Sequence, residues 1–149
     1  MLDYFKRLFA FDNWATLRSL AFLSDYPSAK ALTAISHVLL AQKIWLLRLN
    51  DQDSSSVPTY KDFSLEDCKT MSGEIQKGYV EFLNEIQESD LDRLLTYKNT
   101  KGVEFQTSIR DILMHVAFHS VYHRGQVASF VRSDGGEPLN TDYITFTRL

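Results

Sequence analysis

Three histidines near the C-terminal end of the chain share one spacing and are the residues best suited to chemistry. His115, His119 and His123 lie in the run MHVAFHSVYHRGQV, and His37 is the only other histidine among the 149 residues. A helix turns about 100° and rises about 1.5 Å per residue, so residues four apart share a face, about 6 Å apart. Two imidazoles at this spacing can reach one metal ion, as on the helix of zinc proteases. The glutamate of that protease motif is absent, because Ser120 follows His119, so the sequence predicts a metal site of another kind.

The hydrophobic period of this segment indicates which histidines point inward. Apolar residues recur at alternating steps of three and four, which is typical of the core-facing stripe of a bundled helix. His119, His123 and Gln126 interrupt that stripe, and a buried polar side chain is costly without partners. His115 lies just beside it. We therefore expect His119 and His123 to be metal ligands and His115 to be a pocket residue. The stripe comprises Ile109, Ile112, Val116, His119, His123, Gln126 and Phe130.

His37 interrupts a second apolar stripe, between Thr33 and Leu40, in another helical segment. If the two segments face each other, they could deliver three imidazole nitrogens to one point. Three protein ligands with an open position are typical of catalytic or ligand-accepting metal sites, whereas structural zinc usually has four. The alternative is a hydrogen-bonded histidine network in the core, because a single inward histidine is more often that than a ligand.

Four helical segments must position these residues. Ser64 with Asp67, and Ser108 with Asp111, resemble capping pairs that open the third and fourth helices. Before the fourth helix, apolar and polar residues alternate every second position, as in a strand. The runs LLTYKN and VEFQTS flank a turn at 99–102, and together they predict a short β-hairpin. The sequence thus predicts an all-α fold: a four-helix bundle with a β-hairpin before the last helix, in a single domain over residues 1–149. The expected helices cover about 2–23, 29–49, 64–89 and 108–132.

Several polar or small residues fall where a simple bundle helix would not need them. Asp12 stands where the stripe of the first helix should continue, so we expect it to face a pocket together with His115 and Gln126. Gly73 and Gly78 weaken the third helix by about 1 kcal/mol each relative to alanine and could allow another helix to approach closely. Arg124 could bind a carboxylate or phosphate, but we interpret it as an exposed helix arginine.

Composition excludes several classes of protein. The net charge is −3 and the pI is about 5.8, so the basic surplus that drives nucleic-acid binding is missing. Cys68 is the only cysteine, which excludes an intrachain disulfide and a thiolate-rich metal site. The N-terminal segment does not resemble a signal peptide, and we expect no stretch that spans a membrane. These features predict a soluble cytoplasmic protein.

The motifs also resemble those of a known family. The string from His119 to Gln126, HSVYHRGQ, strongly resembles the hallmark of the DinB-like, damage-inducible family. His37 with Trp45, and the run Phe11-Asp12-Asn13-Trp14-Ala15, are similar to its other motifs, and the resemblance covers nearly the whole chain. It implies a four-helix bundle, often dimeric, with one divalent ion per chain, usually nickel or zinc, held by His37, His119 and His123. Related bundles act as thiol S-transferases with small thiols such as mycothiol or bacillithiol, as maleylpyruvate isomerases or as hydrolases.

Two hypotheses of function remain. The first is a metal-dependent enzyme, a thiol S-transferase or hydrolase, with His115 as proton acceptor and Gln126 and Asp12 as further candidate catalytic residues. The second is a non-catalytic metal-binding stress-response or interaction module. In either case we expect a homodimer, because the second helix is broadly apolar and because Phe11, Trp14 and Tyr143 look exposed in the sequence.

Overall fold

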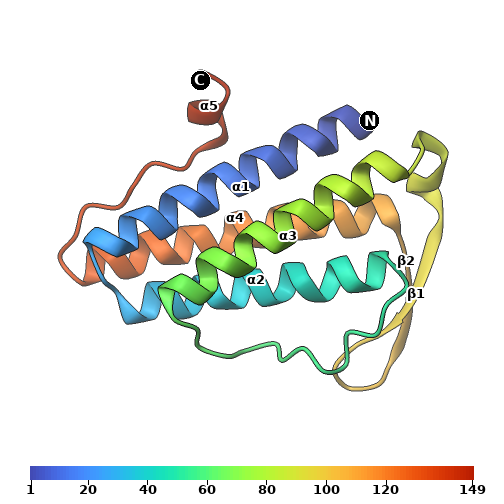
Figure 1. The fold of residues 1–149 in the computed structure, drawn as a ribbon, viewed down its shortest axis with the longest axis horizontal. Coiled ribbons are helices and arrows are strands. Elements are labelled where there is room, and N and C mark those ends of the chain that lie inside the picture. Colours follow the sequence, from blue (N-terminus) through green and yellow to red (C-terminus); the bar gives the residue numbers. More distant parts are fainter.

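The computed structural model describes all 149 residues and shows four long helices side by side (Figure 1). Helix α3 packs against α1 and α2, and α4 packs against α2 and α1, which closes a four-helix bundle. A two-stranded sheet stands at one end, and the C-terminal tail runs back along α1 to a short helix. The elements are α1 (Leu2–Asp25), α2 (Ala29–Leu49), α3 (Leu65–Glu85), the 3₁₀ turn η1 (Glu88–Asp92), β1 (Leu94–Lys98), β2 (Glu104–Ser108), α4 (Ile109–Ser133) and α5 (Tyr143–Phe146).

The connection between α2 and α3 travels the length of the bundle. Helices α2 and α3 run in the same direction, so the segment 50–64 must return from the end of α2 to the start of α3 (Figure 1). A helix of 21 residues is about 31 Å long, and an extended chain gains about 3.3 Å per residue. The segment is therefore long enough, and its path carries it across the outer side of α2.

The predicted caps and hairpin are present. Ser64 and Asp67 form a reciprocal capping box, and the Ser108 side chain accepts from the Asp111 amide. Strands β1 and β2 pair antiparallel from Leu94↔Ser108 to Lys98↔Glu104. In the turn between them Gly102 has φ +77°, a conformation that glycine adopts without steric cost.

The end of the third helix differs from the expectation. It ends at Glu85, not near Ser89, because Ile86 turns extended and a new capping interaction starts the short η1 turn. There the Gln87 amide donates to the Asp90 carboxylate at 2.7 Å. An aspartate side chain competes with the helix for a backbone donor, and here it breaks the helix.

The core of the bundle is apolar, and α2 packs against α4 and α3. By length and composition α2 is apolar enough to cross a membrane, with a mean hydropathy of 1.2 over its most apolar window, contrary to the expectation of no such stretch. Half of that window is buried within the bundle, and Ser36 and Gln42 are buried polar residues on the same helix. Partial burial within the bundle and buried polar side chains are both typical of a helix that packs in a protein core. The best-buried side chains include Phe5, Leu20, Leu39, Tyr79, Leu83, Ile112, Leu113 and Val116.

Candidate metal centre

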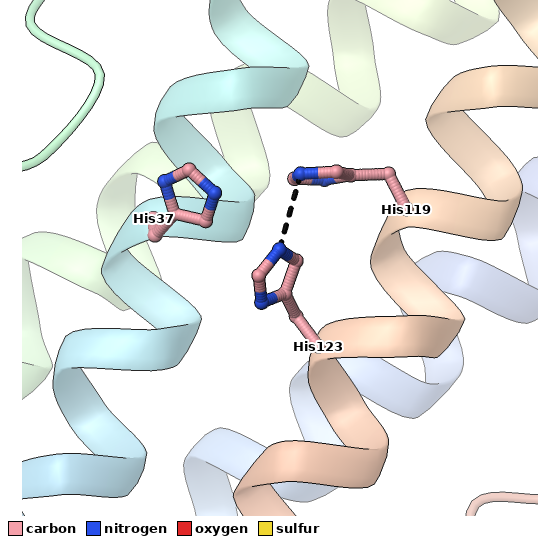
Figure 2. A group of neighbouring side chains, drawn as sticks. All are labelled: His37, His119 and His123. Carbon is pink, nitrogen blue, oxygen red and sulfur yellow. Dashed lines mark hydrogen bonds between the residues drawn. The ribbon is translucent and has the colours of Figure 1, made fainter.

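Three of the four histidines converge at one point between two helices. His119 and His123 extend from α4 towards His37 on the neighbouring α2 (Figure 2). One ring nitrogen from each of the three lies within 4.8 Å of the others, and all three side chains are partly buried. The closest pair, His119 Nε2 and His123 Nε2, are 3.2 Å apart. The structure therefore brings together the three residues that the sequence singled out as ligands.

The hydrogen bonds at the outer side of two rings turn the Nε2 atoms of these rings towards the middle of the cluster. His37 Nδ1 donates to the carbonyl oxygen of Thr59 at 2.8 Å, and His123 Nδ1 donates to the side-chain oxygen of Gln126 at 2.7 Å. Both acceptors are oxygens, so the proton of each neutral ring resides on Nδ1 and the lone pair resides on Nε2. Such outer partners fix the tautomer of metal-binding histidines.

The electrostatics of the cluster favour neutral imidazoles. Burial, with smaller contributions from His123, His37 and His115, lowers the pKa of His119 from 6.5 to about 4. Burial also lowers the pKa of His123, against an opposing effect of its hydrogen bond to Gln126. A metal ion binds the unprotonated ring, so these two side chains are ready to bind at neutral pH.

The donor set fits a divalent ion. Zinc binds imidazole nitrogen at about 2.0–2.1 Å, so two nitrogens of a tetrahedral site are about 3.3–3.4 Å apart. The 3.2 Å between His119 and His123 is close to that spacing. In the structure the two nitrogens share a hydrogen bond, and His119 Nε2 is its donor because the proton of His123 resides on Nδ1. A cation at this point would take the place of that proton.

The outer side of the cluster is aromatic and solvent-exposed. The ring of Tyr60, in the segment between α2 and α3, stacks on His37 with centroids 4.2 Å apart, and Tyr122 meets the ring of His123 edge-on. Both tyrosines are largely exposed. The sequence did not reveal Thr59 or Tyr60 as neighbours of His37. Thr59 acts through its main-chain oxygen and Tyr60 lies in a loop, 22 and 23 positions after His37, so neither belongs to a helical pattern of apolar residues.

His115 lies next to the cluster but outside it. Its ring centroid is 5.5 Å from that of His119, and its other flank meets Trp45 edge-on at 5.4 Å. The side chain is exposed, and partial burial of the ring lowers its pKa. His115 thus lies beside the three histidines and is reachable from solvent.

Asp12 lies elsewhere, and the expected pocket of Asp12, His115 and Gln126 is wrong. Only 6% of Asp12 is exposed, and its carboxylate accepts from Gln42 and Arg124 in the middle of the bundle. The small cavity that it lines contains neither His115 nor Gln126. Gln126 is instead committed to His123.

The interpretation of Arg124 as an exposed helix residue is also wrong. Only 7% of Arg124 is exposed, and it forms a buried ion pair with Asp12. The pair belongs to a polar network in which Gln42 bonds both Asp12 and Ser120, and Tyr79 donates to the carbonyl oxygen of Gln42. The network joins all four long helices, so Asp12 and Arg124 are part of the interior of the bundle that carries the histidines.

Comparison with known proteins identifies relatives over nearly the whole chain. The model of the DinB family matches residues 20–149. The chain is 24% identical to Protein DinB of Bacillus subtilis (strain 168) over 164 aligned positions, which cover 96% of this chain and 93% of that protein. It is also similar to the crystal structure of a DinB-like protein from Bacillus cereus ATCC 10987, with a TM-score of 0.63 and 18% identity over 91% of this chain and 95% of that one. At that identity the structural similarity establishes the fold.

Proposed function

This chain belongs to the DinB family, and on that premise we propose that it binds one divalent metal ion and uses the ion in catalysis. The observation that carries the proposal is the convergence of three imidazole side chains, from two helices, on one point. His37, His119 and His123 would hold the ion. Zinc or nickel is the proposed metal, since nitrogen ligands of this kind suit both.

The bound ion would supply Lewis acidity, lowering the pKa of a water or thiol so that it is a nucleophile near neutral pH. Three neutral ligands leave the positive charge of the ion uncompensated, which strengthens that effect. The reaction class that follows is transfer of a small thiol or hydrolysis. Tyr60 and Tyr122, at the outer side of the cluster, are exposed, and this is the side from which we propose that a small substrate approaches.

His115 is the proposed proton acceptor of the reaction. It lies beside His119 and is exposed. Its lowered pKa keeps the ring unprotonated at neutral pH, so it can take a proton from a substrate. Gln126 orients His123 through Nδ1 and is therefore proposed as a positioning residue. Asp12 is bound within the buried network, and we no longer assign it to the reaction.

Elemental analysis of the purified protein tests the proposal. We expect about one zinc or nickel per chain in the wild type and none in a His119→Ala, His123→Ala double variant. Ser129→Ala, an exposed position on the same helix, is the control and should keep the metal. Absence of metal from the wild type after dialysis against both ions would contradict the proposal and leave the histidines as a core network.

A non-catalytic metal-binding module is the alternative. Under it, the wild type holds metal but turns over no thiol acceptor or ester, and His37→Ala lowers only the thermal stability. Measured turnover that disappears in His115→Ala while the metal content stays the same would exclude the alternative, because His115 is not one of the three proposed ligands.

A further inference from the structure

A groove lies between the segment 51–59 and the β-hairpin. It encloses about 910 Å³, within the size range of small-molecule sites. Ile44 and Thr59 contribute to its lining. Thr59 is also the residue whose carbonyl oxygen holds His37, so the groove shares a wall with the candidate metal centre.

Arg48, near the end of α2, is fixed in the wall of this groove. Its Nε donates to the hydroxyl of Ser54, and its Nη2 donates to the main-chain oxygen of Lys98 on β1. Its guanidinium carbon lies 4.7 Å from the ring centre of Trp45 and 4.8 Å from that of Tyr97. Two neutral acceptors and two rings therefore hold the planar group in one orientation.

The guanidinium of Arg48 is not paired directly with a carboxylate, although three acidic side chains line the same groove. The side chain is partly buried, yet it forms no ion pair with any carboxylate of the chain. Its Nη1 makes no hydrogen bond to protein, and burial lowers the pKa of the group. A partly desolvated cation with a free donor at the edge of a cavity is stabilised by an anion.

We propose that the groove binds a small molecule bearing a single carboxylate and that Arg48 holds this carboxylate. Asp51, Asp53 and Glu104 also line the groove, and they repel a phosphate dianion more strongly than a carboxylate monoanion. Ile44, Leu95 and Tyr97 supply apolar wall for the rest of the molecule.

A substrate that reaches both Arg48 and the histidines must be elongated. His37 and Arg48 are eleven residues apart on α2, about 16 Å along the helix axis. The ligand is thus a carboxylic acid whose reacting group lies far from its acid group. This identification of the bound acid as the substrate rests on the proposed function, whereas binding of the carboxylate by Arg48 does not.

Fluorescence of Trp45 reports directly on the site. The chain has two tryptophans, so in a Trp14→Phe background the signal comes from the ring that packs on Arg48. We expect a saturable change with butyrate, none with its neutral analogue butyramide, and weaker binding of inorganic phosphate. Arg48→Gln should weaken butyrate binding at least about tenfold, the effect of losing a charge-assisted hydrogen bond.

The matched control is Lys101→Gln, which removes the same charge from the hairpin turn outside the groove, and should leave butyrate binding unchanged. No response to butyrate, an equal response to butyramide, or an equal loss in Lys101→Gln would overturn the proposal. Phosphate binding tighter than butyrate would overturn the assignment of a carboxylate. If Arg48→Gln disturbs the hairpin, as seen by circular dichroism, the side-chain ¹⁵N signals of Arg48 in the wild type decide, since butyrate must shift them.

The same titration in the His119→Ala, His123→Ala variant separates this inference from the proposed function. Arg48 touches none of the histidines, so that variant should bind butyrate as the parent does. Loss of metal with retained butyrate binding supports the groove independently. Loss of butyrate binding in that variant would contradict a site formed by Arg48.

Discussion

At the scale of single residues, the tautomers of two histidines depend on their outer hydrogen bonds. Periodicity located His37, His119 and His123, because polar residues in an apolar stripe stand out in the sequence. It could not locate Thr59, whose contribution is a main-chain oxygen, nor show that Gln126 serves His123 and not a substrate. The three histidines can be found from the sequence pattern. The groups that orient them can be found only from the three-dimensional structure.

Gln126→Ala should weaken metal binding without abolishing it. The substitution removes the acceptor that holds the His123 proton on Nδ1, and loss of such a partner typically costs about 10- to 100-fold in metal affinity. Competition with a zinc-binding dye measures the effect. Affinity equal to that of the Ser129→Ala control would show that Gln126 does not orient the ligand.

The stability of the metal-free protein should fall as the pH falls from about 6.5 to about 4. The pKa of His119 is about 4 in the folded chain against 6.5 as the ordinary value. The unfolded chain therefore binds more protons in this window, and acid favours unfolding. Burial acts in the same direction on His115 and His123.

Thermal melts of the chelator-treated protein and of a His119→Gln variant check this pH dependence. Between these pH values the melting temperature of the variant should change less steeply with pH than that of the parent, but it should still change. Parallel slopes in the two proteins would contradict the lowered pKa of His119.

At the scale of elements, a buried ion pair between α1 and α4 explains why Arg124 was wrongly interpreted as an exposed residue. Arg124 looks exposed in the sequence because its neighbours are polar and small, and its partner Asp12 is 112 positions away. Asp12 was expected in a pocket with His115 and Gln126, and the sequence did not indicate that its partner is Arg124. Arg124→Met should destabilise the protein by about 3–5 kcal/mol, since it leaves a buried carboxylate without its counter-charge.

Chemical denaturation measures that loss. An Asp12→Leu, Arg124→Met double variant should recover much of it, because removing both charges removes the desolvation cost as well. A double variant as unstable as the sum of the two single ones would show that the two side chains act independently.

Two glycines of α3 should respond differently to the same substitution. Nothing lies within 4 Å of a side-chain carbon built at Gly73, whereas one at Gly78 would collide with the side chain of Leu46 on α2. Gly73→Ala should therefore raise the free energy of unfolding by up to about 1 kcal/mol. Gly78→Ala should gain less or lose stability, because Leu46 must move. Equal gains in urea denaturation would mean that α2 and α3 are not closely apposed at this point.

At the scale of the whole molecule, most of the architecture follows from the pattern of the sequence. Apolar stripes and capping pairs locate the four helices, and the change from a helical to an alternating pattern of apolar residues locates the hairpin. The parallel course of α2 and α3 does not follow from them, because a loop's composition does not reveal its direction (Figure 1). Tertiary contacts set that course.

We retain the prediction of a homodimer, on different grounds from the sequence. Phe11 is only 6% exposed, since Tyr143 and Phe146 of the tail pack on it. It is therefore covered within one chain. The exposed apolar residues of α4 are Phe118, Val121 and Tyr122. Light scattering at micromolar concentration should give twice the mass of the chain, and Phe118→Ser should reduce it. A monomeric wild type would contradict the prediction.

The hydrogen bond from His37 ends on a main-chain oxygen, and this has a consequence for how the protein can diverge. Every amino acid supplies the same carbonyl, so position 59 can mutate without loss of that acceptor. The segment that forms one wall of the groove is then free to change its side chains during evolution while the histidine stays in place. The binding preference proposed for the groove can therefore change while the three histidines keep their arrangement.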